Sequence, residues 1–427
     1  MLPPDFPLMN SERRVVITGV GVVSPIGNDT ETFLQNSVAG KSGIRAIQAF
    51  DPSELPVRIA GEVLDFNPKA YFKSPKDVRR ADRFTQLGLA ASKMAYEQAG
   101  FDIETPPENA DRIATMVSSG IGGLQIMTIQ HEILMNKGAP RVSPFVIPMM
   151  IANITSGIVS MEYGLRGPNM SIVTACATAN HNIGEAWRII KFGDADAALA
   201  GGSEAAIVRL GVVGFANMKA LSTRNDDPAA ASRPFDTGRD GFVMGEGAGV
   251  VMIEELEHAK KRGAEILAEI TGYGISADAY HITSPHPEGE GASRCMEMAL
   301  GHAQLNPEDV DYVNAHGTST PLGDICETKA IKQTFGEHAK SGLKVSSTKS
   351  MTGHLLGAAG GVELAACVGA IRDGVIPPTI NLEDQDPECD LDYVANEARE
   401  TPVKAALSNS FGFGGHNASI LVEKFEG

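Results

Sequence analysis

The sequence predicts an α/β protein with a largely parallel sheet, because buried strand patterns alternate with helical ones. Arg14 to Gly21 and Ile113 to Gly120 are short apolar runs, rich in β-branched residues, that end in glycine. Glu31 to Ala39 and Asp82 to Ala99 carry helical periodicity. Strands separated by helices in this way favour parallel pairing in a sheet that helices cover.

Two more strands and a helix complete the first half of the chain. Asp196 to Ala200, followed by two glycines, and Gly249 to Glu254 are the strands. Glu257 to Arg262 is predicted to be helical and to end at Gly263, because glycine is common just after a helix.

The pattern then begins again, which predicts two similar halves, residues 1–262 and 263–427. Three pairs of segments share strand or small-residue helix patterns: Val15 to Gly21 with Ile266 to Gly274, the segment around Cys176 with Gly353 to Glu363, and Ala197 to Gly202 with Ala405 to Ser410.

The composition is that of a soluble globular protein, with 427 residues, 43% of them hydrophobic and 21% charged. A net charge of −17 argues against a general nucleic-acid binder. The five cysteines are scattered without a C-x-x-C, so neither a disulfide framework nor a zinc site is predicted. We expect a cytoplasmic protein, since the cysteine usage indicates a reducing compartment and Met1 to Pro7 lacks the features of a signal peptide. No membrane span is expected, because no apolar stretch has the required length.

Cys176 is the strongest candidate for chemistry. It follows the β-branched run Ser171 to Thr174 and precedes a helical segment, which predicts a strand that delivers a thiol to the first turn of a helix. Free N–H groups and the helix dipole would then lower its pKa from about 8.5. The alternative is a buried core cysteine, the commoner fate of a single Cys.

His316 follows an apolar strand, Val310 to Asn314, and precedes the hydroxyls of Thr318 and Thr320. Ligands bind at strand ends in α/β sheets, so His316 is placed to reach a pocket and the threonines to contact a polar ligand. A structural histidine beside turn threonines is the alternative interpretation.

Lys349 and His354 flank a loop rich in serine, threonine and glycine. The lysine is placed to keep the imidazole neutral, so that it can donate a hydrogen bond. An ordinary helix cap or a phosphate loop is the alternative, although the chain lacks the G-x-x-x-x-G-K-[ST] pattern. Asn409 to Asn417 is a glycine-rich segment that either supplies an oxyanion hole or is a plain turn.

Four motifs in this order resemble those of β-ketoacyl-acyl-carrier-protein synthases of the Cys-His-His type, most closely type II. The likeness extends from Arg13 to Glu423 and rests on Thr174 to Thr178, His316 to Thr320, Lys349 to His354 and Gly412 to Gly415. It implies a thiolase fold, with two βαβαβαββ halves related by a pseudo-dyad in five α-β-α-β-α layers, and a homodimer.

The resemblance also implies a decarboxylative Claisen condensation. Cys176 would accept an acyl group from acyl carrier protein, with the N–H groups of Cys176 and Phe413 as oxyanion hole. His316 and His354 would hydrogen-bond the enolate of malonyl carrier protein, and Lys349 would support the second histidine. No permanently bound cofactor and no metal are implied, because phosphopantetheine of the carrier protein brings the substrates.

Further residues match positions that have supporting roles in the family. Glu363 matches a buried carboxylate of the histidine network, Phe242 an aromatic near the leaving carboxylate, and Ile121 a residue of the acyl pocket that Phe413 would gate. Thr318 and Thr320 would contact the pantetheine arm. The family's docking patch for the acidic carrier protein is matched by Lys76, Arg79, Arg80 and Lys219.

Several questions stay open at this point. Asp324 and Glu327 are either structural or linked to a cation, and chain-length preference is undetermined. A polyketide ketosynthase of the same chemistry and a non-catalytic chain-length factor are the alternatives. A thiolase is disfavoured, because its second catalytic cysteine would lie in a glycine-rich loop, whereas Cys389 lies among acidic residues.

Overall fold

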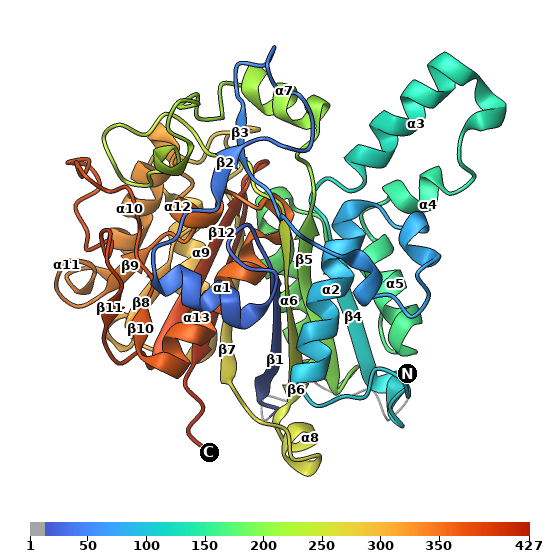
Figure 1. Ribbon diagram of the computed structural model, residues 1–427. Helices are drawn as coiled ribbons and strands as arrows, with labels where there is room; N and C mark the ends of the chain where they lie inside the picture. The colour runs from blue at the N-terminus through green and yellow to red at the C-terminus, as the bar shows by residue number, and fades with distance from the viewer. Residues whose placement is uncertain (1–12) are drawn as a thin grey trace.

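One mixed sheet runs through both halves of the chain in a computed structural model that describes residues 13–427 (Figure 1). The predicted loose start, Met1 to Pro7, lies outside the described residues. The strand order is β4-β5-β6-β1-β7-β13-β12-β8-β9. These strands are β1 (Val15–Val23), β4 (Ile113–Ser118), β5 (Ala197–Glu204), β6 (Gly247–Glu255), β7 (Ala268–Ala277), β8 (Tyr312–Asn314), β9 (Lys344–Ser346), β12 (Ala405–Gly412) and β13 (His416–Glu423).

The prediction of a largely parallel sheet is wrong. Only β4 with β5, β12 with β8 and β8 with β9 pair in parallel, and the other neighbours are antiparallel. Strand direction could not be predicted from the sequence, because β6 and β13 are buried almost throughout. A strand covered on both faces gives a continuous apolar run whichever way it points.

Five layers are present, as the resemblance implied. β1 meets β7 through only three residue pairs, and the two parts of the sheet face one another across α6 (Thr178–Phe192) and α13 (Ala359–Asp373). Helix α2 (Arg83–Gln98) covers the outer face of the first part. Helices α9 (Glu290–Ala303) and α10 (Pro321–Phe335) lie on the outer face of the second.

The two halves repeat one arrangement. The order β4-β5-β6-β1 in the first half corresponds to β8-β12-β13-β7 in the second, and the three pairs of similar segments fall on equivalent elements. Each central helix is preceded by a 3₁₀ turn with a strained residue, Ala175 at φ +50° before α6 and Leu356 at φ +49° before α13. The boundary between residues 262 and 263 itself stays a prediction.

Glycines expected to end the first strand of each half lie inside it instead. A Cβ on Gly21 of β1 would lie 1.8 Å from the carbonyl oxygen of Ala91 in α2. A Cβ on Gly274 of β7 would lie 1.8 Å from that of Cys295 in α9. These glycines therefore let an outer helix pack directly on the backbone of a strand, once in each half.

The predicted helices Glu31 to Ala39, Asp82 to Ala99 and Glu257 to Arg262 are confirmed to within a residue or two. No helix of residues 13–427 has the length and apolar character needed to cross a membrane. The remaining elements are α1 (Thr30–Val38), α3 (Leu124–Lys137), α4 (Val146–Met150), α5 (Ile154–Tyr163), α7 (Arg209–Asn217), α8 (Leu256–Lys261), α11 (His338–Ser341), α12 (Lys349–Thr352), β2 (Ile44–Ala46), β3 (Ile59–Gly61), β10 (Val375–Ile376) and β11 (Arg399–Glu400).

Candidate active site

Cys176 lies in a 3₁₀ turn, Ala175–Ala177, that leads directly into α6. The strand predicted over residues 171–174 does not form. Side chains of the turn and helix bind its backbone instead, since Ile172 N donates to Asn182 Oδ1 and Thr174 N donates to Thr178 Oγ1. The thiol nevertheless reaches the N-terminal end of α6, as the sequence predicted.

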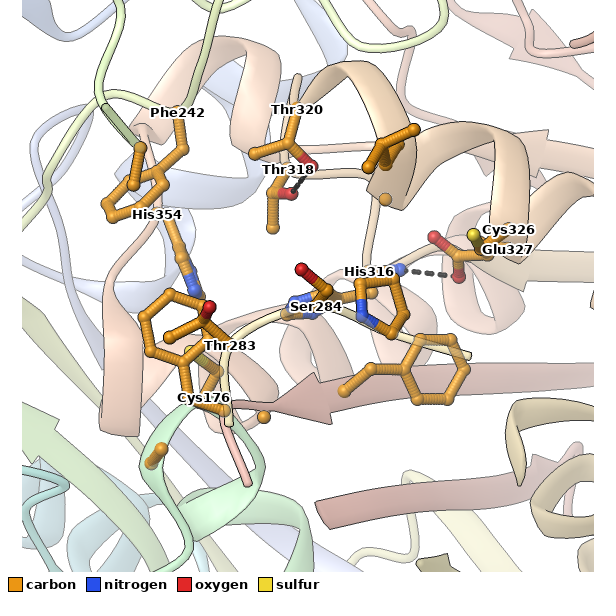
Figure 2. Close-up of a pocket in the computed structure, with 18 of the residues that line it drawn as sticks. Cys176, Phe242, Thr283, Ser284, His316, Thr318, Thr320, Cys326, Glu327 and His354 are labelled. Carbon is orange, nitrogen blue, oxygen red and sulfur yellow. Dashed lines mark hydrogen bonds between the residues drawn. The ribbon is translucent and has the colours of Figure 1, made fainter. Parts of the chain in front are cut away.

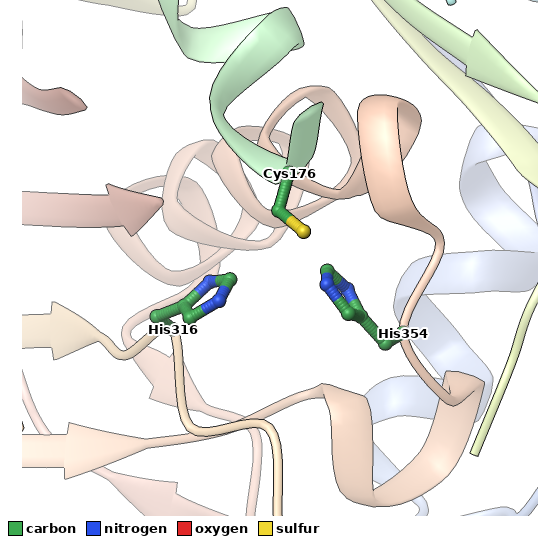
Figure 3. Close-up of side chains that lie close together, drawn as sticks. All are labelled: Cys176, His316 and His354. Atoms are coloured by element: carbon green, nitrogen blue, oxygen red, sulfur yellow. The ribbon is translucent and has the colours of Figure 1, made fainter. Parts of the chain in front are cut away.

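Cys176, His316 and His354 meet at one point (Figure 3). One Sγ or ring-nitrogen atom from each lies within 4.8 Å of the other two, and the two rings stand at 88° with centroids 5.3 Å apart. His316 follows β8 and His354 follows α12. Residues from both halves of the chain therefore converge on the sulfur.

These three residues line a cavity of about 570 Å³ (Figure 2). Other residues singled out in the sequence also line it: Ile121, Lys219, Phe242, Thr318, Thr320, Glu327 and Phe413. Lys349 and Glu363 lie behind it, and Lys76, Arg79 and Arg80 are not part of its wall. Thr318 and Thr320 approach each other to 3.1 Å between their hydroxyl oxygens.

The predicted lowering of the Cys176 pKa is wrong for the free protein. Burial raises the pKa of this thiol to about 12, against the opposing influence of the Lys349 charge and the Phe413 N–H. The helix end and these two groups favour a thiolate, but removal from water outweighs them. Cys176 of the free protein is therefore a neutral thiol.

His354 is neutral, as predicted, but burial rather than Lys349 is the main cause. Burial lowers its pKa well below the usual value, and the Lys349 charge lowers it further. Leu356 N donates to Nδ1 at 3.3 Å, so the ring proton resides on Nε2, which has no protein partner within residues 13–427. His354 is thus a hydrogen-bond donor toward the cavity.

His316 has a similar electrostatic environment. Burial lowers its pKa well below the usual value, and the charge of Lys349 adds to the effect. Its backbone N donates to Glu327 Oε1 at 2.8 Å, and Gly317 N donates to Glu327 Oε2 at 2.7 Å. Glu327 therefore fixes the backbone that carries the ring.

Cys, His and His at this spacing also form a donor set that zinc can use. A zinc-bound histidine usually donates its second ring N–H to a carboxylate, a carbonyl or water. His354 Nδ1 does the opposite and accepts the Leu356 N–H. This arrangement favours a histidine that donates hydrogen bonds over one that binds a metal.

Lys349 and Glu363 form a buried ion pair behind the histidines. Their side chains are only 2% and 3% exposed. Burial raises the pKa of Glu363 and the Lys349 charge opposes this. Lys349 is therefore held in place by Glu363 and acts on the histidines through its charge.

Asp324, like Glu327, holds the loop that follows His316. Its carboxylate accepts Phe235 N at 2.9 Å and Ser319 N at 3.2 Å, and it pairs with Arg239 at 3.6 Å. Both acids thus have structural contacts in this loop, which is the first of the two interpretations left open by the sequence.

Aromatic rings line the wall beside Cys176. Phe242 meets His354 edge-on with centroids 5.4 Å apart, and Phe215 lies 5.5 Å from Phe242 and 6.4 Å from Phe413. Gly412 permits the close approach of β12, because a Cβ there would lie 2.6 Å from Thr174 O. Phe215 was missed by the sequence reasoning, since it lies in an unremarkable apolar helix.

The predicted docking residues fall on two separate places. Arg79 and Arg80 are exposed on the 3₁₀ turn Asp77–Arg80, and Lys76 is exposed directly before it. Arg80 also pairs with Asp77 at 3.3 Å. Lys219 is exposed beside the cavity, just after α7. The structure thus places one cation of the set at the cavity wall and three outside it.

A thiol between two neutral imidazoles, beside backbone N–H groups at a helix end, is a geometry for acyl transfer. Comparison with known proteins gives the same class. A family model described as the β-ketoacyl synthase N-terminal domain matches residues 12–259, and one described as the C-terminal domain matches residues 267–383. The chain therefore belongs to the β-ketoacyl synthase family, whose members are acyltransferases.

Relatives and solved structures extend this result over nearly the whole chain. The 3-oxoacyl-[acyl-carrier-protein] synthase 2 of Coxiella burnetii is 54% identical over 413 residues, 97% of this chain and 99% of the relative. A β-ketoacyl synthase structure from Burkholderia phymatum has a TM-score of 0.89 at 35% identity, over 97% of this chain and 100% of the other. A type II polyketide ketosynthase, solved with its acyl carrier protein, has a TM-score of 0.88 at 34% identity, over 97% and 100%.

Proposed function

We propose that this β-ketoacyl synthase elongates acyl chains by decarboxylative condensation, with Cys176 as the nucleophile. The thiol attacks the thioester of an acyl carrier protein, releases the carrier thiol and keeps the acyl group. Malonyl carrier protein then loses CO2, and its enolate carbon attacks the acyl-Cys176 carbonyl. The condensation gives β-ketoacyl carrier protein and expels the Cys176 thiolate, which returns to the thiol by taking a proton from solvent.

The convergence of Cys176, His316 and His354 within 4.8 Å is the observation that carries this proposal. The backbone N–H groups of Cys176 and Phe413 would stabilise the oxyanion during both acyl transfers, an effect that is usually worth about 3 to 4 kcal/mol per donor. The His354 Nε2–H would donate to the enolate oxygen, together with His316. Phe242 would provide an apolar wall from which the carboxylate leaves as neutral CO2.

The substrates are proposed to arrive on the phosphopantetheine of acyl carrier protein, with Thr318 and Thr320 contacting the arm. Ile121 and Phe413 would face the acyl chain. Lys219 beside the cavity, with Lys76, Arg79 and Arg80, would attract an acidic carrier protein, since local positive potential steers an oppositely charged partner. The chemistry uses no permanently bound cofactor, and we propose a cytoplasmic location.

A homodimer is the proposed assembly. β4 is an edge strand of the sheet, and the neighbouring helices α3, α4 and α5 expose apolar side chains. Met135 is 70% exposed, Ile147 57% and Met161 72%. An exposed apolar patch of this kind is typical of a protein interface.

Malonyl-ACP decarboxylation separates the roles of cysteine and histidine. Cys176→Gln should form no acyl-enzyme but should still release CO2, because the histidines stabilise the enolate. Adding His316→Ala or His354→Ala to this variant should lower CO2 release at least tenfold. Unchanged CO2 release in both double variants would contradict the enolate role.

A polyketide ketosynthase is the second candidate, because a structure of that class is similar over 97% of the chain. The higher identity, 54%, to a 3-oxoacyl-[acyl-carrier-protein] synthase 2 favours fatty-acid elongation. Two sets of substrates distinguish these candidates: carrier proteins loaded with saturated acyl chains of graded length, and carrier proteins loaded with polyketide starter units. The products released from each set are compared. A chain-length factor is disfavoured by the presence of all three cavity residues.

A further inference from the structure

Glu204, the last residue of β5, is a buried carboxylate in the cavity wall that the proposed chemistry does not use. Burial raises its pKa to about 7, although hydrogen bonds from Ser119, Gly357 and Gly120 oppose this. An acidic side chain is rarely buried without partners. Its hydrogen-bond donors come from two segments that are distant in the sequence, residues 119–120 and Gly357.

The first segment carries the acyl-pocket residue Ile121. Ser119 Oγ donates to Glu204 Oε1 at 2.5 Å, and the same hydroxyl oxygen accepts Ile121 N at 3.2 Å and Gly122 N at 2.7 Å. The Ser119 hydroxyl therefore links the Glu204 carboxylate to the backbone of Ile121, so that the position of one fixes the position of the other.

The second segment orients His354. Glu204 Oε2 accepts Gly120 N at 3.0 Å and Gly357 N at 3.1 Å. Gly357 directly follows Leu356, whose N–H holds the His354 tautomer. A Cβ on Gly357 would lie 2.3 Å from Gly120 N, so the two segments are in direct backbone contact at the carboxylate.

We propose that Glu204 is a positioning residue that joins the acyl-pocket segment to the His354 segment, and that its link through Ser119 determines which acyl chains are accepted. This inference rests on the proposed function. The link through Ser119 uses Oε1. Oε2 binds the N–H groups of Gly120 and Gly357, and so contacts both segments.

Three variants remove different parts of this arrangement. Ser119→Ala loses the hydroxyl that binds Glu204 Oε1 and the N–H groups of Ile121 and Gly122, and keeps the Oε2 contacts. Glu204→Gln keeps one oxygen for the Gly120 and Gly357 N–H groups, but the amide nitrogen that replaces Oε1 cannot accept the hydrogen bond that the Ser119 hydroxyl donates, so the variant should resemble Ser119→Ala. Glu204→Ala loses both links. Ser203→Ala is the matched control, because the neighbouring Ser203 Oγ is buried without a hydrogen-bond partner in the described residues.

The test measures kcat/KM with acyl carrier proteins of graded length and, separately, the rate of malonyl-ACP decarboxylation, with thermal unfolding to confirm folding. Ser119→Ala and Glu204→Gln should change the ratio of long-chain to short-chain kcat/KM at least threefold and keep decarboxylation within twofold of wild type. Glu204→Ala should lower decarboxylation at least tenfold, and Ser203→Ala should match wild type in both.

An unaltered chain-length ratio in Ser119→Ala and Glu204→Gln would overturn the inference. A parallel loss of transfer and decarboxylation in every folded variant would also overturn it, because a purely structural role predicts that pattern. If the wild type itself forms no acyl-enzyme, the proposed function fails instead, independently of Glu204.

Discussion

Removal of the ammonium group of Lys349 should destabilise the protein strongly. Lys349 and Glu363 are 2% and 3% exposed, so Lys349→Met leaves a carboxylate in the interior without its counter-charge. Breaking a buried pair in this way costs about 3 to 5 kcal/mol of unfolding free energy. Lys332→Met is the matched control, since Lys332 and its partner Asp390 are 31% and 39% exposed and such a pair contributes less than about 1 kcal/mol.

The deficit should depend on pH in a defined direction. Burial already raises the Glu363 pKa against the Lys349 charge, so loss of that charge raises it further. A carboxyl whose pKa is higher in the folded than in the unfolded state destabilises the fold when ionised. The deficit of Lys349→Met is therefore full above the folded-state pKa and shrinks as the pH falls through it.

Urea unfolding followed by far-UV circular dichroism, at fixed protein concentration and at pH 7.5 and 5.5, measures this effect. Lys349→Met/Glu363→Leu, which removes both charges, should recover most of the stability. A Lys349→Met variant within about 1 kcal/mol of wild type at pH 7.5 would refute the reasoning. So would a deficit that grows on acidification.

Other consequences of the structure are equally open to measurement. Because burial raises the pKa of Cys176 to about 12, its alkylation by iodoacetamide should accelerate up to pH 9.5 without a plateau; a plateau near pH 7 would indicate a resting thiolate. Gly21→Ala places a Cβ 1.8 Å from Ala91 O and should cost at least about 2 kcal/mol in urea unfolding. Gly301→Ala on α9, where a Cβ meets nothing within 4 Å, should gain about 0.5 to 1 kcal/mol; equal effects in the two variants would contradict the packing described here.

The sequence predicted the elements and the duplication well, because both depend on local patterns. Buried apolar runs and helical periodicity placed β1, α2 and α8 within a residue or two. Strand direction was not predictable, since it depends on which neighbours a strand meets. The glycines of β1 and β7 were expected to end their strands for a related reason, because their function is to admit a helix that is distant in the sequence.

The candidate site was predictable as a set of residues, and its electrostatics were not. Spacing and residue type selected Cys176, His316 and His354, which the structure brings within 4.8 Å. The pKa of Cys176 moves in the opposite direction from the prediction, since burial depends on the whole fold. Glu204 was missed, although a charged residue two positions after Gly202 in a buried strand was a visible signal.

Intact-protein mass spectrometry after incubation with acyl carrier proteins tests the central claim most directly. Wild-type protein should gain the mass of one acyl group, located on the peptide that contains Cys176, and Cys176→Ala should gain none. An acyl group on another residue, or equal acylation of Cys176→Ala, would contradict the assignment of Cys176 as the nucleophile.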